Sequence, residues 1–317
     1  MAYLCALGCY LPPRVVDNSE IAALVGADPA WILQATGIVE RRFAAPEESV
    51  ATLGTRAAKD CLESAGVSAA EVGLILVSCG SSERRFPGPA TEIAAALGAQ
   101  GMPAGTPAID LPLASVGSLF GLALAASLCH DYRNVLIIGT EIMSRVVRLD
   151  PTGRDTAILF GDGAGACLVS AETGFARIVD SVMHSDGEFA GALRLDLDSP
   201  LHMEGRTIIL QASRKLPRAI TEVLDRNHTK AGEVGTFVMH QANLNLITRV
   251  AKALGVPESK FFCNVERYGN TSSASLLIAA AEWWRESGQR IEAPIVFAAF
   301  GAGLNWGALL AVPVAPE

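Results

Sequence analysis

Four short apolar runs, rich in β-branched residues, recur along the chain at a nearly constant spacing. They are LILVS (74–78), VLIIG (135–139), TFVMH (236–240) and IVFAA (295–299). The first and third begin at residues 74 and 236, an offset of 162, and the second and fourth begin at residues 135 and 295, an offset of 160. Runs of this kind are typical of buried strands in a parallel sheet. The two similar offsets indicate that one unit of structure occurs twice.

The segments between these runs also correspond. The helix-like sequence PATEIAAALG (89–98) follows the first run as NLITRVAKALG (245–255) follows the third. The apolar stretch that opens at Ser115 corresponds in the same way to TSSASLLIAAAEWW (271–284). Any α/β protein repeats strand–helix units, but offsets this similar favour a duplication.

The composition supports a large core. Of the 317 residues, 50% are hydrophobic and 18% are charged, which is enough for two fused units. We predict an α/β fold with an N-terminal half at residues 1–170 and a C-terminal half at residues 171–317, sharing one core. The net charge is −8 with no basic block, which argues against nucleic acid as a partner.

The cysteines and the apolar stretches bear on where the protein works. None of the seven cysteines has CxxC or zinc-type spacing, so we expect free thiols in a reducing cytoplasm and no metal site. The longest apolar stretches contain turn residues or end too early to span a bilayer, and we find no signal peptide. The sequence predicts a cytoplasmic protein with no membrane partner.

Three polar residues lie where such a fold gathers functional groups, at the carboxyl ends of its strands. Ser115 opens the apolar stretch SVGSLFGLALAASL, and His240 ends the third run. Asn270 precedes the helix that corresponds to the one at Ser115. These three residues form our candidate site.

Five motifs, in order along nearly the whole chain, carry a resemblance to a known family. They are ATGIVERRF (35–43), LFGDGAGA (159–166), HQAN (240–243), YGNTSSAS (268–275) and FGAGLNWGALL (300–310). The chain resembles the thiolase fold and, within it, the β-ketoacyl-ACP synthase III family of condensing enzymes. The resemblance implies a five-layer α-β-α-β-α sandwich and an acyltransferase that takes acyl-CoA as substrate and needs no cofactor.

The glycine-rich segment GDGAGA (161–166) also resembles a dinucleotide-binding fingerprint. That fingerprint must lead from a strand into a helix. Here the segment is followed by ACLVS, which has the pattern of a strand. We therefore reject a nicotinamide site and attribute the glycines to tight backbone packing.

The resemblance assigns roles to the three candidate residues, with one departure. In the family, the helix that Ser115 opens begins with a cysteine, which accepts an acyl group from acyl-CoA as a thioester. The histidine and asparagine, here His240 and Asn270, then polarise the thioester carbonyl of malonyl-ACP while it loses carbon dioxide. This chain has serine at the nucleophile position.

Serine needs more activation than cysteine. A thiol with a pKa near 8.5 is tipped towards thiolate by a helix N-terminus. The serine alkoxide lies more than ~3 pH units, roughly 4 kcal/mol, above neutrality, and a helix dipole contributes only ~0.3–2 kcal/mol. We therefore expect His240 to act as general base for Ser115, and the backbone N–H groups of Ser115 and Ala302 to form the oxyanion hole.

Other interpretations of these residues stay open. Ser115 is also explained as a plain helix N-cap in a protein that has lost activity, or as a serine introduced for cysteine to trap a complex. Asn270 is also explained as the cap of a helix that begins at Thr271, because asparagine is a favoured N-cap.

The resemblance also implies a coenzyme A site. Trp31 and Arg154 match the residues that hold the adenine from its two faces. Gly205 and Asn243 match positions along the pantetheine tunnel. A buried, structural Trp31 is the alternative.

Two partners follow from the resemblance. Phe86 is similar to a residue that crosses a homodimer interface to close the partner's acyl pocket, and an ordinary loop aromatic is the alternative. An acyl carrier protein is expected as the second partner. The helix after HQAN offers it only Arg249 and Lys252, with Asn245 in place of a basic residue.

We expect a β-ketoacyl-ACP synthase III-like acyltransferase that loads an acyl group onto Ser115. It then transfers that group to, or condenses it with, a malonyl-ACP-type acceptor in fatty-acid or specialised polyketide biosynthesis. Because an ester is a poorer acyl donor than a thioester, serine shifts the balance towards transfer. The alternatives are a non-catalytic acyl-CoA-binding partner of a cysteine-bearing condensing enzyme and an acyl-CoA thioesterase.

Overall fold

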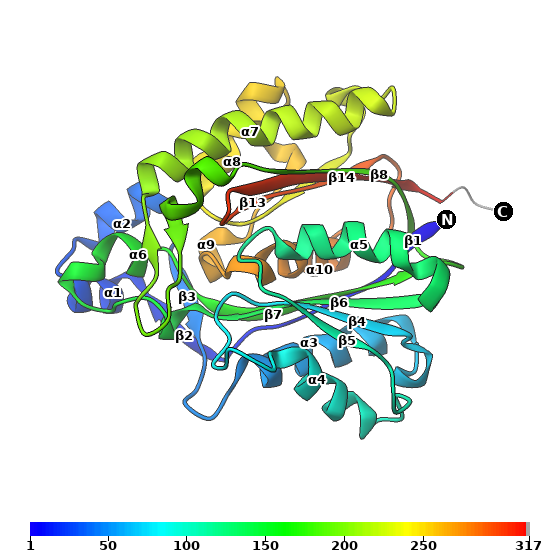
Figure 1. Ribbon diagram of the computed structural model, residues 1–317. Helices are drawn as coiled ribbons and strands as arrows, with labels where there is room; N and C mark the ends of the chain where they lie inside the picture. Colours follow the sequence, from blue (N-terminus) through cyan, green and yellow to red (C-terminus); the bar gives the residue numbers. More distant parts are fainter. Residues whose placement is uncertain (315–317) are drawn as a thin grey trace.

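Helices and strands alternate in five layers, α-β-α-β-α (Figure 1). The structure is a computed structural model that describes residues 1–314. The first sheet layer has the strand order β1–β7–β6–β4–β5. These strands are β1 (Ala2–Tyr10), β7 (Asp162–Ser170), β6 (Asn134–Ile142), β4 (Leu74–Ser78) and β5 (Ala108–Leu111).

The second sheet layer repeats this order as β8–β14–β13–β11–β12. Its strands are β8 (Ala176–Ser185), β14 (Asn305–Pro313), β13 (Ile295–Gly301), β11 (Thr236–Met239) and β12 (Phe261–Phe262). The two layers join where residues 2–4 of β1 pair with residues 176–178 of β8, so the ten strands are continuous.

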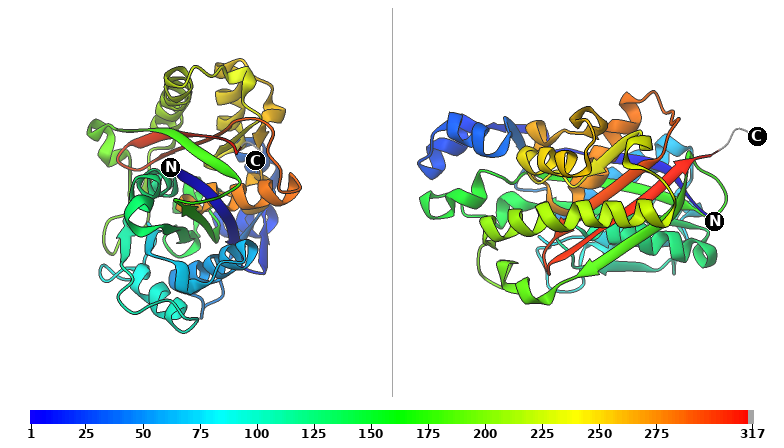
Figure 2. Two further views of the ribbon diagram at one scale, coloured as in Figure 1. Left: turned by 90° about the vertical axis from the view of Figure 1, so that its right-hand side faces the viewer. Right: turned by 90° about the horizontal axis from the view of Figure 1, so that it is seen from above.

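Six long helices make the three helical layers. The outer pairs are α3 (Val50–Ala65) with α4 (Pro89–Gly98), and α7 (Gly205–Arg226) with α8 (Leu244–Leu254), and the central pair is α5 (Gly117–Tyr132) with α10 (Ser275–Glu286). Seen from above, α7 lies across β13 and β14 (Figure 2).

Shorter elements gather at one end of the layers, where Figure 1 shows α1, α2 and α6 beside the antiparallel two-stranded sheet of β2 and β3. They are β2 (Arg14–Asp17), α1 (Asn18–Val25), α2 (Pro29–Thr36), β3 (Glu40–Phe43), α6 (Arg154–Ala157), β9 (Leu193–Arg194), β10 (His202–Met203) and α9 (Val265–Tyr268). No helix within residues 1–314 is long and apolar enough to cross a membrane.

The predicted duplication is confirmed, because each of the four apolar runs forms a strand and corresponding runs occupy corresponding places. The four runs form parallel pairs as predicted, β4 with β6 and β11 with β13, but each sheet layer as a whole is mixed. In each layer the first two strands, β1 and β7 or β8 and β14, run antiparallel to their neighbours. The division of the chain at residues 170 and 171 stays a prediction.

Gly163 and Gly165 of GDGAGA lie in β7 at its contact with α10, and the residues that follow the motif continue this strand, as predicted. A Cβ on Gly165 would lie 2.6 Å from the Leu277 Cβ, so the helix can approach the strand only where the side chain is absent. Tight packing explains this segment. The central helices α5 and α10 are apolar on most sides because a sheet covers each of their two faces.

Candidate active site

Ser115 lies in the turn between β5 and α5. Its φ angle of 65° falls in the left-handed region, which is uncommon for a residue other than glycine, and it is 6% exposed. The helix begins two residues later, and its N-cap, Val116, makes no side-chain capping bond. The interpretation of Ser115 as a helix N-cap is therefore wrong. The strained turn places Ser115 before the N-terminus of a 16-residue helix.

Residues from both halves fix this turn. A Cβ on Gly301, at the end of β13, would lie 2.2 Å from the Ala114 carbonyl oxygen, so glycine is required for the close approach. The Ser115 N–H donates to the Ser272 hydroxyl at 3.1 Å, and the Ser78 hydroxyl donates to the Leu113 carbonyl at 2.8 Å. The turn is held from the strand ends of both sheets.

His240 follows β11 directly and is buried. Its backbone N–H donates to the Ala298 carbonyl of β13 at 2.9 Å. Its ring Nδ1 contacts the hydroxyl of Ser275, the first residue of α10. Burial lowers the pKa of His240 to about 4, so the ring is neutral near pH 7.

Asn270 lies between α9 and the 3₁₀ turn Ser272–Ala274, and it is also buried. Its Oδ1 accepts the Ser272 N–H at 2.8 Å and so caps that turn, whereas α10 begins at Ser275 and not at Thr271. Within residues 1–314, its Nδ2 has no hydrogen-bond partner and so is free to donate.

These three side chains line one cavity of about 830 Å³. Ser115 comes from the N-terminal half, and His240 and Asn270 come from the C-terminal half. Much of the remaining wall is apolar and includes Met143, Phe160, Leu193, Met203, Ile208, Leu216 and Phe300. A mostly apolar cavity with a few polar groups is typical of a site that binds a small molecule.

The cavity also contains three of the four residues expected to contact coenzyme A: Trp31, Gly205 and Asn243. Both polar atoms of the Asn243 side-chain amide already have hydrogen-bond partners within the protein. Its Oδ1 accepts the Asn245 N–H at 2.8 Å as the N-cap of α8, and its Nδ2 donates to the Ala35 carbonyl at 3.1 Å.

Arg154, the fourth residue, lies against Trp31, with its guanidinium carbon 5.3 Å from the ring centroid. Trp31 is 39% exposed, so the alternative of a buried structural tryptophan is wrong. An aromatic ring inserted between two flat groups needs about 7 Å between them. The half-exposed Arg154 side chain must therefore move before an adenine fits between the two.

The two expected oxyanion donors differ in their surroundings. The Ser115 N–H is already donated to the Ser272 hydroxyl. Ala302 lies in the turn after β13, outside the cavity lining, and its carbonyl accepts from the Asn305 side chain at 2.6 Å.

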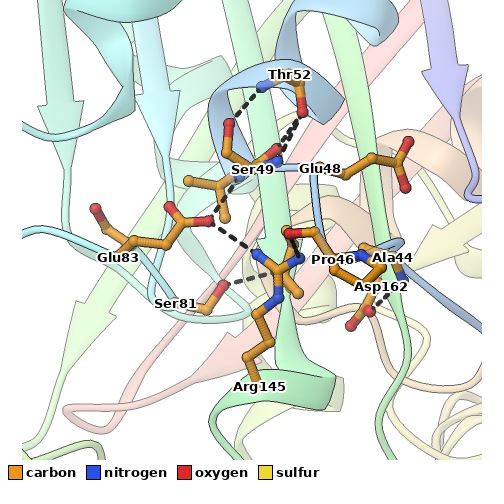
Figure 3. A network of polar contacts seen from close by, with 12 residues as sticks. Ala44, Pro46, Glu48, Ser49, Thr52, Ser81, Glu83, Arg145 and Asp162 are labelled. Carbon is orange, nitrogen blue, oxygen red and sulfur yellow. Dashed lines mark hydrogen bonds and ion pairs between the residues drawn. The ribbon is translucent and has the colours of Figure 1, made fainter.

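Phe86 is 86% exposed and does not reach the cavity within its own chain. Its loop is anchored at Glu83, which accepts the Val50 N–H at 3.1 Å and pairs with Arg145 at 3.5 Å (Figure 3). Arg145 also donates to the Ala45 carbonyl at 2.8 Å. These contacts present the aromatic ring to the outside.

Sequence reasoning missed Glu141, at the end of β6. It is fully buried, and its carboxylate accepts the N–H of Gly80 at 3.0 Å, of Ser81 at 2.9 Å and of Ser273 at 3.3 Å. The Ser81 and Ser273 hydroxyls also donate to it, at 2.5 and 2.8 Å. The acidic residue in the apolar run VLIIGTEI was the available signal. Glu141 therefore connects the loop after β4 to the 3₁₀ turn Ser272–Ala274, which contacts Ser115.

The duplicated five-layer fold, with its cavity at the start of the central helix, defines an acyl-transferring enzyme of the thiolase-like class. Two family profiles match the chain: 3-oxoacyl-[acyl-carrier-protein (ACP)] synthase III over residues 109–187, and its C-terminal counterpart over residues 224–312. The chain belongs to the β-ketoacyl-ACP synthase III family.

Individual relatives agree with this assignment. The β-ketoacyl-[acyl-carrier-protein] synthase III of Solibacter usitatus (strain Ellin6076) is 36% identical over 98% of each chain. The crystal structure of 3-oxoacyl-[acyl-carrier-protein] synthase III from Aquifex aeolicus VF5 has a TM-score of 0.91 at 34% identity, over 98% of this chain and 100% of that one. The priming β-ketosynthase of the R1128 polyketide biosynthetic pathway has a TM-score of 0.89 at 32% identity, over 100% and 97%.

Proposed function

We propose that this chain loads an acyl group from acyl-CoA onto Ser115 and passes it to a malonyl-ACP-type acceptor, by transfer or by condensation. The observation that carries the proposal is the convergence of Ser115, His240 and Asn270 on one cavity of about 830 Å³. The names of the relatives, which include an acyl-carrier-protein synthase and a priming ketosynthase, support a carrier protein as partner and a role in fatty-acid or polyketide biosynthesis.

In the loading step, the Ser115 hydroxyl attacks the thioester carbonyl and gives its proton to His240. The ester bond forms as the carbon–sulfur bond breaks, and His240 returns the proton to the departing coenzyme A thiolate. A base is required because the serine alkoxide lies roughly 4 kcal/mol above neutrality and the dipole of α5 contributes only ~0.3–2 kcal/mol. The neutral His240 ring has a lone pair for this purpose.

In the second step, the free Asn270 Nδ2 and the His240 ring donate to the carbonyl oxygen of the malonyl thioester. Loss of carbon dioxide then gives a carbanion, which attacks the carbonyl carbon of the Ser115 ester. The carbon–carbon bond forms as the ester carbon–oxygen bond breaks, and the departing Ser115 oxygen takes up a proton from solvent. Because an ester is a poorer acyl donor than a thioester, transfer to a heteroatom acceptor competes with this condensation.

Negative charge on the acyl oxygen is proposed to be stabilised by the backbone N–H groups of Ser115 and Ala302. The Ser115 N–H must then share its proton between the substrate oxygen and the Ser272 hydroxyl, 3.1 Å away. Coenzyme A is proposed to bind along Trp31, Arg154, Gly205 and Asn243, with Arg154 moving to admit the adenine.

The proposed assembly is a homodimer in which Phe86 closes the partner's cavity. Two features support it: Phe86 is 86% exposed, and β5 is an unpaired sheet edge that carries the exposed Ile109. Sedimentation of the wild type and of Phe86→Ser tests this assembly. A monomeric wild type contradicts it.

The loading step is tested by incubating the full-length chain with acetyl-, propionyl- and longer acyl-CoAs and measuring its intact mass. We expect an acyl adduct that is absent in Ser115→Ala and kept in Ser127→Ala, a serine of α5 whose hydroxyl donates to Ala123 away from the cavity.

Three other outcomes overturn the proposal. An adduct that survives Ser115→Ala places the nucleophile elsewhere. Free acid that accumulates without a carrier protein identifies a thioesterase, and tight binding of coenzyme A without any turnover identifies a non-catalytic binding protein.

A further inference from the structure

The partner of the His240 ring on its buried side is a hydroxyl, and a hydroxyl can both donate and accept. The Ser275 oxygen contacts His240 Nδ1, and it also accepts the Gln241 backbone N–H at 3.1 Å. Ser275 is 2% exposed, so water does not replace either contact.

The two tautomers of His240 differ in whether the Ser275 hydroxyl proton has an acceptor. Within residues 1–314, His240 Nδ1 is the one acceptor within hydrogen-bond range of the Ser275 hydroxyl. With the ring proton on Nδ1, the Ser275 oxygen accepts two N–H groups and its own buried proton has no partner. With the ring proton on Nε2, the hydroxyl donates to Nδ1 and accepts from Gln241, so the Ser275 proton and the ring Nδ1 both have a partner.

We propose that Ser275 is a positioning residue that holds His240 in the tautomer with its proton on Nε2, the nitrogen on the side away from Ser275. An unpaired buried hydroxyl proton disfavours the other tautomer by about ten- to a hundredfold. The neutral state of the ring, which is needed for a choice between tautomers, follows from its burial.

The proposal deepens the proposed function and rests on it, because it states which half-reaction the resting enzyme is set for. With Nε2 protonated, His240 and the free Asn270 Nδ2 present two donors, the pair needed to polarise a malonyl thioester carbonyl. Loading of Ser115 needs Nε2 without its proton, so this preference works against loading. Ser275 therefore favours the second step at the expense of the first.

The test measures the tautomer directly. Full-length protein carrying ¹⁵N-histidine is examined by NMR near pH 7, and the His240 signals are assigned from their loss in His240→Gln. We expect the protonated-nitrogen shift at Nε2 in the wild type and in Ser275→Thr, which keeps the hydroxyl. In Ser275→Ala we expect a mixture of both tautomers.

A second measurement separates this role from a merely structural one. We expect Ser275→Ala to load Ser115 from propionyl-CoA at least as fast as the wild type, because the unfavourable preference is gone. A loss of packing alone slows loading.

A wild-type ring protonated on Nδ1 overturns the proposal, and so does a Ser275→Ala variant with the wild-type tautomer. These failures are distinct from failure of the proposed function. The NMR result does not depend on acylation, and an absent Ser115 adduct leaves the assigned tautomer unchanged.

Discussion

The two halves of the molecule place different residues at equivalent strand ends. Cys79 is the first residue after β4 and His240 is the first residue after β11, although the offset of 162 residues aligns His240 with Ser78. Both Cys79 and His240 are buried. Cys79 lies outside the cavity, and burial together with the nearby Glu141 raises the pKa of its thiol well above the ordinary value. His240 lines the cavity. One strand end is therefore part of the buried interior, and the other lines the cavity.

The neighbouring strands show the same contrast. Glu141 is the penultimate residue of β6 in one half, and its carboxylate accepts hydrogen bonds from Ser81 and Ser273 in two different loops. Gly301 ends β13 in the other half, and its missing side chain lets the turn of Ser115 approach. The two corresponding strand ends therefore have different roles. A large polar side chain connects two loops at one of them, and the absence of a side chain lets the Ser115 turn pack closely at the other.

The largest expected effect comes from the two residues that directly follow β11 and β4. His240→Ala is predicted to lower acyl transfer by about 10²–10⁴-fold, the range found for removal of a proton-transferring residue. Cys79→Ala is predicted to keep transfer within about threefold of the wild type, because the buried thiol lies outside the cavity and its truncation removes only packing and one weak contact to Glu141. Steady-state transfer rates with one acyl-CoA check both, and equal losses contradict the contrast.

Glu141→Ala tests the contribution of the buried Glu141 carboxylate to the stability of the fold. It leaves the N–H groups of Gly80, Ser81 and Ser273 without their shared acceptor, so we predict a loss of about 4 kcal/mol in the free energy of unfolding. The control is Glu172→Ala, an exposed partner of Arg133, with an expected change below about 0.5 kcal/mol. Urea denaturation measures both, and similar midpoints for the two variants contradict the role of Glu141.

Acid is predicted to weaken the fold through His240. Its folded pKa of about 4 lies below the ordinary 6.5, so between these values the unfolded chain binds a proton that the folded chain does not. The associated stability is complete above pH 6.5 and falls by about 3 kcal/mol as the pH drops to 4. Urea denaturation between pH 4 and 6.5 checks this prediction. In His240→Gln, the free energy of unfolding is expected to change less with pH, because the titrating ring is absent.

Trp31→Ala, at the rim of the cavity, is the mildest change. We predict about tenfold weaker binding of coenzyme A by calorimetry, because one face of the adenine loses its aromatic contact. Leu33→Ala, an exposed apolar residue of the same helix outside the cavity lining, is predicted to bind within about twofold of the wild type. Equal affinities for all three proteins would place the adenine elsewhere.

Much of the fold was predictable because strands buried on both faces need long apolar side chains, which the four runs supply. Only the second part of the antiparallel β7, ACLVS, was predicted as a strand, because its first residues DGAG have glycine and alanine in place of those side chains where α10 packs. The motifs pointed to Ser115, His240 and Asn270, and the cavity brings these residues together. The catalytic roles we give them remain proposals.

The repeat, the apolar patterns and the order of the motifs lie in the linear order of residues, and they determined the architecture and the family. The φ angle of Ser115, the close approach of Gly301, the buried Glu141 and the Ser275 contact to His240 depend on residues far apart in the chain. Such features are set by which atoms meet once the two halves pack, because a hydrogen bond or a steric contact depends on distance in space and not on distance along the chain.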